Sequence, residues 1–337
     1  MIRIAIDAMG GDHAPEEIIK GAQLSAKEGQ ELIFVGDEEQ LIPLLKNYNF
    51  HRTQANIVHA EEVIGGDEPP VQAVRKKPGA TLPTAVRLIK EGKADAVLSA
   101  GNTGAFMAAA VLYLKCIEGI HRPAISPALP TQDPDRMVVL LDVGANMDAE
   151  AVHLLQYGIM GSLYAEKRFH IKSPKIGLLN VGDEAGKGSK VVQDAFKLLL
   201  DSKVHFVGNV ESREIFANKA DVVICDGFVG NAVLKAGEGL VEAIFTMMKK
   251  EFTSGVREKA GAALLQPAFS NLKRRLDYSE YGGAPLLGIN GVCIKSHGSS
   301  NAQAISNGIK VAANLVEEKL LKEIREQIQR QEDENND

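Results

Sequence analysis

Glycines and short polar residues end five apolar runs of this 337-residue chain, and together they could bind an anion. The runs lie within residues 2–15, 94–105, 137–146, 175–188 and 221–231. Backbone amides in glycine-rich turns, above all at helix N-termini, attract phosphate and carboxylate groups. The pattern therefore predicts a cleft for anionic groups.

The first two turns, DAMGGDHAP and SAGNTGA, combine short polar side chains with glycines that let a ligand approach the backbone closely. The alternative is structural, because Asp12, Asn102 or Thr103 could simply cap a helix. The candidates for phosphate or substrate contact in these two turns are Asp7, Gly10, Gly11, Asp12, Gly101, Asn102, Thr103 and Gly104.

A lysine stands in the glycine-rich turn NVGDEAGKGS. The spacing excludes a P-loop, because Lys187 occupies the position of the second glycine and Gly188 separates it from Ser189. Such a lysine is often solvated, but its place at a strand end favours a role on an anion. Neighbouring candidates for substrate contact are Asn180, Gly182 and Glu184.

The segments DVGAN, DGFVGN and SHGSSN add polar residues after three further strands. His297 has two interpretations, a capping or core residue on one side and a catalytic or phosphate-contacting group on the other. Cys225 is expected to be a buried strand residue rather than a nucleophile. The candidates from these segments are Asn146, Asp226, Asn231, His297 and Gly298.

Strands that alternate with helices must position these turns. Each apolar run has the length of a buried parallel strand, and helical stretches such as residues 82–92 separate the runs. This alternation predicts an α/β fold of three αβα layers with a mostly parallel sheet, whose strand carboxyl ends form the cleft. We expect one continuous catalytic unit over residues 1–325, followed by a polar, frayed tail over residues 326–337.

Composition excludes several classes of protein. The net charge is −6, tryptophan is absent and aromatic residues make up 5%, which argues against a nucleic-acid partner. The three cysteines are scattered and the acidic residues follow no metal-ligand spacing, so we expect no metal and no cofactor. Because no apolar run reaches the length of a signal sequence or a membrane span, we expect a cytoplasmic protein.

One segment, residues 247–281, breaks the alternation. Pro267 is expected to end a first helix and to allow a second beside it, which predicts an inserted helical hairpin with apolar and basic character. Such a surface could lie on an anionic membrane, bind an acidic carrier protein or form a dimer contact. The residues expected to carry this contact are Arg257, Lys259, Leu264, Leu265, Phe269, Leu272, Lys273, Arg274 and Arg275.

In their order along the chain, these motifs and GGAPLLGINGVCIKSHG resemble the bacterial acyl-[acyl-carrier-protein]:phosphate acyltransferases of phospholipid synthesis. The resemblance spans nearly the whole chain. It implies a fold similar to phosphotransacetylases and isocitrate-type dehydrogenases, a homodimer and a reaction without metal or nucleotide. Inorganic phosphate would attack the thioester of a long-chain acyl carrier protein, and the acyl phosphate would pass to a membrane glycerol-3-phosphate acyltransferase.

That chemistry assigns roles to the candidates. Lys187 would align phosphate and stabilise charge. Asn231 and the amides around Gly101–Gly104 would donate to the oxyanion and to phosphate, and His297 would assist proton transfer to the thiol. Two alternatives remain open. One is another enzyme of the same fold group, such as a short-chain phosphotransacetylase or a decarboxylating dehydrogenase. The other is a non-enzymatic scaffold that binds lipid or carrier protein.

Overall fold

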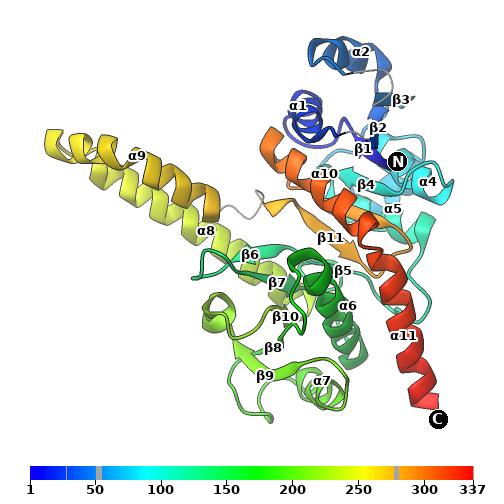
Figure 1. The fold of residues 1–337 in the computed structure, drawn as a ribbon, viewed down its shortest axis with the longest axis vertical. Coiled ribbons are helices and arrows are strands. Elements are labelled where there is room, and N and C mark those ends of the chain that lie inside the picture. Colours follow the sequence, from blue (N-terminus) through cyan, green and yellow to red (C-terminus); the bar gives the residue numbers. More distant parts are fainter. Residues whose placement is uncertain (28, 51–54, 277–280, 337) are drawn as a thin grey trace.

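The computed structural model describes residues 1–27, 29–50, 55–276 and 281–336 (Figure 1). Its larger sheet has seven strands in the order β3-β2-β1-β4-β12-β11-β5. The first five pair in parallel, while β11 and β5 are antiparallel to their neighbours. The strands are β1 (Ile2–Asp7), β2 (Gln30–Gly36), β3 (Ala55–His59), β4 (Ala96–Ser99), β5 (Ala124–Ile125), β11 (Ala284–Leu287) and β12 (Val292–Lys295).

A second sheet has five strands in the order β6-β7-β10-β8-β9. Its strands are β6 (Ala128–Pro130), β7 (Met137–Leu141), β8 (Ile176–Asn180), β9 (Phe206–Glu211) and β10 (Val222–Ile224). Parallel pairing again dominates, with β6 as the antiparallel exception. The predicted α/β class with mostly parallel strands is confirmed, but the strands divide between two sheets rather than forming a single one.

Helices cover both sheets. The largest hydrophobic cluster joins Ile6 of β1 and Leu141 of β7 through Tyr157, which is completely buried, so one core connects the two sheets. The helices are α1 (Glu16–Ser25), α2 (Glu38–Asn47), α3 (Pro70–Lys76), α4 (Thr81–Lys90), α5 (Thr103–Leu114), α6 (Ala151–Phe169), α7 (Lys190–Leu200), η1 (Ser212–Ala217, a 3-10 helix), α8 (Gly227–Phe252), α9 (Val256–Leu276), α10 (Ala302–Glu317) and α11 (Leu320–Asn336).

The C-terminal region differs from the expected frayed tail. Helix α11 continues to Asn336, and its apolar residues Leu320, Ile324 and Ile328 are buried in the main core. Their spacing of four residues places them on one face, and this buried face stabilises the first half of a helix whose later residues are polar. The last residue, Asp337, lies outside the described residues.

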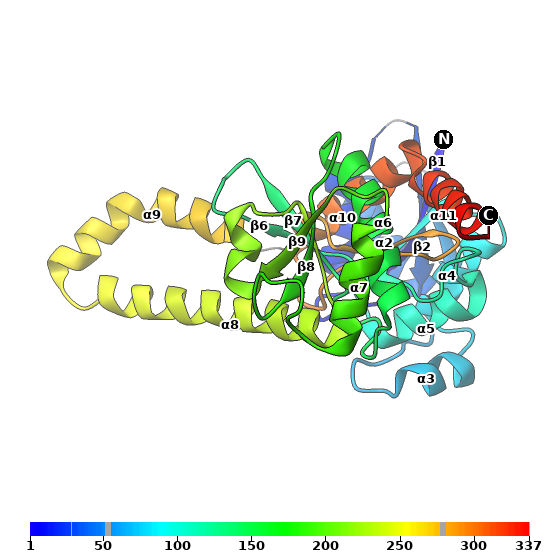
Figure 2. The same cartoon turned by 90° about the horizontal axis from the view of Figure 1, so that it is seen from below.

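The predicted helical hairpin is present, but its turn lies elsewhere. Helix α8 ends at Phe252 and α9 begins at Val256, so Pro267 is inside α9 rather than between two helices. Thr253 Oγ1 donates a hydrogen bond to Lys249 O and helps to close the end of α8. The two helices lie side by side and project away from both sheets (Figures 1 and 2). Residues 277–280 of the predicted segment lie outside the described residues.

The start of α8 has no space for a side chain at Gly230. A Cβ atom there would lie 1.9 Å from Asp142 O and 2.9 Å from Cys225 Sγ. We expect Gly230→Ala to lower the free energy of unfolding by about 1–3 kcal/mol, the usual cost of overpacking. Gly239→Ala on the same helix meets no atom within 4 Å and is expected to raise it slightly through helix propensity. Denaturant titration of both variants measures the difference, and equal stabilities would contradict the packing argument.

Candidate active site

A pocket of about 440 Å³ lies where the two sheets meet. The turns after β1, β4 and β12 form one side of it, and Val143 and the first turns of α8 form the other. Ser99 and Lys295 are register partners at the ends of β4 and β12, so their turns open at the same edge. The cleft predicted at the carboxyl ends of the strands is therefore present.

The turns after β1 and β4 approach each other so closely that a side chain would not fit between them. A Cβ atom on Gly10 would lie 2.3 Å from Asp7 Oδ2 and 2.9 Å from Gly101 N. Gly11 has a φ of 111°, which disfavours other residues, and it lines the pocket together with Asp12 and Gly101. Gly298 also lines the pocket, and its carbonyl accepts a hydrogen bond from Asp12 N at 2.8 Å.

Asp7 stabilises the turns at this edge from the protein interior. It is completely buried, and its Oδ2 accepts a hydrogen bond from Ser99 Oγ at 2.6 Å. Ser99 Oγ in turn accepts one from Gly101 N at 3.0 Å. Burial raises the pKa of the Asp7 carboxyl, although the bond from Ser99 opposes that effect. Asp7 is not among the described residues that line the pocket, and its bond to Ser99 helps to fix the turn after β4.

Asn102 lines the pocket, but its side-chain atoms form hydrogen bonds within the protein. Its Oδ1 accepts from Ala105 N at 2.9 Å and caps α5, while its Nδ2 donates to Gly65 O and Gly66 O. The capping alternative therefore holds for this side chain. Thr103, the first residue of α5, also lines the pocket, whereas Gly104 packs against Pro70 and lines a separate groove. The N-terminus of α5 therefore lies at the pocket, and a helix N-terminus favours a bound anion.

Lys295 lines the pocket but was not predicted from the sequence, and the same is true of Lys235. Lys295 ends β12 and is only 8% exposed, and its Nζ donates to Ser296 O. Burial lowers its pKa to about 8, against the opposing charges of Asp7 and Asp12. A buried ammonium group of this kind is well suited to bind a phosphate ion. The available signal was a lysine that directly follows the apolar residues Val292, Cys293 and Ile294.

His297, which the sequence singled out, lines the same pocket two residues further on. Its Nδ1 lies 2.8 Å from Ser299 Oγ. Partial burial, followed by the positive charge of Lys235, lowers its pKa below the ordinary value. The imidazole is therefore neutral at neutral pH and able to accept a proton.

Helix α8 contributes three lining residues to the opposite wall, Asn231, Leu234 and Lys235. Asn231 lies in the first turn, next to Gly144, where an added Cβ would be 3.7 Å from the Asn231 Cβ. The predicted candidate Asp226 caps this helix by accepting a hydrogen bond from Val229 N at 2.9 Å, and it does not line the pocket. Asp226 therefore positions Asn231 indirectly.

Asp142, at the end of β7, organises the turn that joins the two walls. Its Oδ1 accepts from Ile125 N at 2.9 Å and from Ala145 N at 3.1 Å, and its Oδ2 accepts from Asn146 N. Burial raises its pKa to about 6. The candidate Asn146 lies outside the pocket, donates its side-chain amide to Tyr157 and accepts at its carbonyl from Gly227 N. It supports the start of α8.

The turn that holds Lys187 lies outside the pocket. The Lys187 side chain is 53% exposed, and its Nζ is 3.9 Å from Glu184 Oε1. Asn180 Nδ2 donates to Lys187 O, and a Cβ on Gly182 would meet Glu184 Oε2 at 2.9 Å. These four candidates thus form one separate turn after β8. Since β8 pairs with β10, which leads into α8, the turn shares its sheet edge with the start of that helix.

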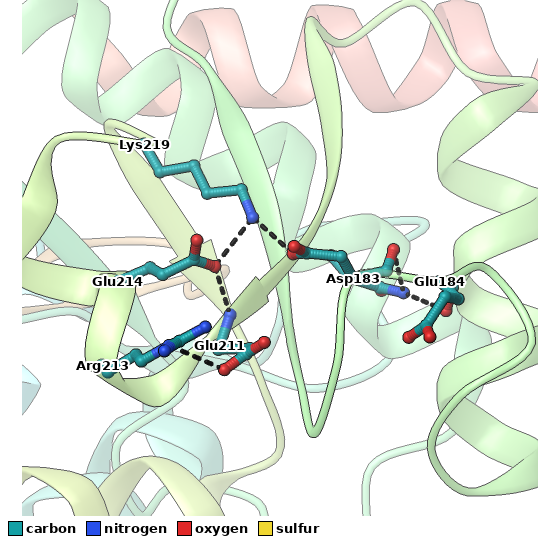
Figure 3. Close-up of polar contacts among 7 residues, drawn as sticks. Asp183, Glu184, Glu211, Arg213, Glu214 and Lys219 are labelled. Atoms are coloured by element: carbon teal, nitrogen blue, oxygen red, sulfur yellow. Dashed lines mark hydrogen bonds and ion pairs between the residues drawn. The ribbon is translucent and has the colours of Figure 1, made fainter.

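Lys219, which follows η1, and Asn209 of β9 hold this turn in place (Figure 3). Lys219 Nζ contacts Asp183 Oδ1 at 2.5 Å and Glu214 Oε2 at 2.7 Å. Asn209 Nδ2 donates to Glu184 O at 2.9 Å. These contacts anchor the first half of the turn and leave Lys187, in its second half, accessible to solvent.

The described residues hold no group of three or more histidine, cysteine or acidic side chains that could bind a metal ion. Cys225 is buried, as predicted, and burial raises the pKa of its thiol well above the ordinary value. The lysines Lys295, which is buried, and Lys235, which is half-exposed, both line the pocket.

The hairpin residues fall into two groups. Leu264 and Leu265 are 84% and 53% exposed, whereas Phe269 packs against Phe252 with ring centroids 4.8 Å apart. Phe269, which is half-buried, therefore stabilises the hairpin internally, and its role in a membrane or carrier-protein contact stays a prediction. The remaining predicted contact residues are exposed on α9, namely Arg257, Lys259, Leu272, Lys273, Arg274 and Arg275. None of the helices in the described part of the chain has an apolar stretch of membrane-spanning length.

Known proteins resemble the chain over almost its full length. The family described as "Fatty acid synthesis protein" matches residues 2–323. A phosphate acyltransferase of Pelotomaculum thermopropionicum is 51% identical, over 97% of this chain and 95% of that protein. One of Heliobacterium modesticaldum is 50% identical, over 97% and 98%. A phosphotransacetylase from Streptococcus pyogenes shares the fold, with a TM-score of 0.62, 20% identity and 94% coverage of both chains.

Proposed function

Because this chain belongs to the fatty acid synthesis protein family, and within it to the phosphate acyltransferases, we propose that it transfers a long-chain acyl group from acyl-[acyl-carrier-protein] to inorganic phosphate. The observation that carries this proposal is the pocket at the junction of the two sheets, which combines backbone amides, the buried Lys295 and the neutral His297. The acyl phosphate would serve glycerol-3-phosphate acylation in phospholipid synthesis.

The reaction needs no protein nucleophile. A phosphate oxygen attacks the thioester carbon, the carbonyl oxygen gains negative charge, and the C–S bond then breaks to release the carrier-protein thiolate. A thiolate is a good leaving group, because the pKa of a thiol is about 8.5. The enzyme must therefore orient phosphate and stabilise the oxyanion.

We assign these tasks to groups in the pocket. Lys295 binds phosphate together with the amides of Asn102 and Thr103 at the start of α5, and Asn231 donates to the oxyanion across the cleft. His297 accepts a proton from the attacking phosphate and returns it to the thiolate. Lys187, on the neighbouring turn, is proposed to supply a second positive charge to the phosphate.

Mass spectrometry provides the decisive test. Purified protein, palmitoyl carrier protein and phosphate are mixed in the presence of a chelator and without nucleotide. We expect acyl phosphate and free carrier protein in equal amounts. Butyryl carrier protein and acetyl-coenzyme A serve as parallel donors, because exclusive use of the acetyl donor would instead indicate a short-chain phosphotransacetylase. Absence of acyl phosphate with every donor would refute the proposal.

We further propose a cytoplasmic homodimer that associates peripherally with an anionic membrane and delivers its product to a membrane glycerol-3-phosphate acyltransferase. The supporting feature is the projecting α8–α9 hairpin, where exposed Leu264 and Leu265 lie on the same helix as several basic residues. Apolar side chains could enter the lipid boundary while lysine and arginine contact the headgroups.

Liposome sedimentation tests the membrane contact. We expect Leu264→Glu combined with Leu265→Glu to release the protein from anionic vesicles, because two new charges would oppose insertion and repel the headgroups. Acyl transfer in solution should change little, since neither residue lines the pocket. The matched control is Gln266→Glu, an exposed polar position beside them. Unchanged sedimentation of a folded double variant would contradict the anchor and favour carrier-protein or dimer contact.

A further inference from the structure

An apolar groove lies next to the pocket along helix α8. It has a volume of about 310 Å³ and is lined by residues of β6, η1, α8 and the end of α9. Leu234 lines both this groove and the phosphate pocket. The two spaces therefore meet at a shared side chain.

Helix α8 presents its groups in the order that a thioester substrate would need. Asn231 lines the pocket in the first turn, while Gly237 and Val241 line the groove further along. From Asn231 to Val241 the helix rises about 15 Å. A carbonyl held near Asn231 would therefore have its alkyl chain directed past Leu234 into the groove.

The groove lining suits a hydrocarbon chain. Leu129, Phe216 and Val233 are among its walls. The acidic side chain that lines it, Glu238, is paired with Lys235, whose Nζ lies 2.8 Å from Glu238 Oε2. This ion pair offsets part of the negative charge beside the groove, while Glu238 Oε1 has no hydrogen-bond partner among the described residues.

We infer that the groove along Leu234, Gly237 and Val241 binds the alkyl chain of the acyl donor while its thioester lies in the pocket. The inference rests on the proposed acyl transfer and adds a chain-binding subsite to it. Each methylene that leaves water strengthens binding about fourfold, so occupancy of this groove favours long chains over short ones.

Another apolar groove, of about 470 Å³, lies beside α3 and α5. Among the described residues, none lines both that groove and the pocket. A chain bound there would not be continuous with the thioester. The α8 groove is therefore the better site for the alkyl chain.

A filled groove should change chain-length preference. A Cβ atom on Gly237 meets nothing within 4 Å, so Gly237→Leu can fold while its side chain occupies the groove. The matched control is Gly239→Leu, which is equally unobstructed and does not line the groove. We expect Gly237→Leu to lower the ratio of kcat/KM for palmitoyl over butyryl carrier protein at least tenfold, and Gly239→Leu to leave that ratio unchanged.

Further variants keep the test decisive. Val241→Phe fills the same groove one helical turn after Gly237. It replaces Gly237→Leu in the test if thermal unfolding shows that Gly237→Leu is misfolded. An unchanged ratio in a folded, active groove variant would overturn the inference while leaving acyl transfer to phosphate intact. A shift caused instead by Ala108→Leu would place the chain in the α5 groove. A wild-type protein that forms no acyl phosphate would refute the proposed function, and the subsite with it.

Discussion

Lys295→Met is expected to lower kcat/KM for phosphate by at least about 100-fold, the scale seen when one preorganised electrostatic group is removed. Lys295 is buried at the end of β12 and lines the pocket, so solvent screens its charge only weakly. Methionine has a similar length but no charge. The loss should therefore appear mainly as weaker use of phosphate, measured by steady-state kinetics at varied phosphate concentration.

The pH dependence follows from the same burial. Because the pKa of Lys295 is lowered to about 8, the ammonium form predominates below pH 8 and is lost above it. The KM for phosphate should rise as the pH passes 8, and Lys295→Met should abolish this rise. The free energy of unfolding, in contrast, increases over the same pH range. The unfolded chain keeps its proton up to a pKa of about 10.4, so the folded state gains stability as the pH increases from about 8 toward 10.

Lys235→Met is the matched control for this prediction. Lys235 lines the same pocket, but its side chain is half-exposed and already paired with Glu238. Its removal should cost only a few-fold in kcat/KM, because solvent and the carboxylate both weaken its action on phosphate. Near-normal phosphate kinetics in a folded Lys295→Met protein would remove Lys295 from the site.

The strand-to-helix turns were predictable because their signal is local. Apolar runs of strand length followed by glycine and short polar residues indicate where a parallel strand hands over to a helix, and the structure places Gly11, Gly101, Asn231 and His297 around one pocket. Lys295 was not predicted because its role in the site depends on contacts between distant segments of the chain. The sequence next to Lys295 does not reveal Ser99, its register partner on β4, or Asp7 on β1, whose charge acts on the lysine.

The errors in the prediction likewise have tertiary causes. Pro267 was expected to end a helix, but α9 continues through it while packing on α8, as the contact between Phe252 and Phe269 shows. Asn102 was predicted either to contact an anion or to cap a helix, and its side-chain amide is also bonded to carbonyls of Gly65 and Gly66 more than thirty residues away. No local pattern encodes either contact, because each depends on how distant segments pack.

Lys187→Ala is the second variant with a large expected effect, a fall in turnover of about 100-fold if its charge acts on the phosphate as proposed. Stability should hardly change, because the side chain is half-exposed and its ion pair with Glu184 is long, at 3.9 Å. The matched control is Lys190→Ala, an exposed lysine that pairs with Asp194 at the start of α7. Acyl phosphate formation by both variants is measured at saturating donor.

Full activity of Lys187→Ala would confine phosphate binding to Lys295 and the pocket amides. A loss in Lys187→Ala alone would instead mean that the turn after β8 acts together with the pocket, since both lie along the edge where β8 and β10 end and α8 begins.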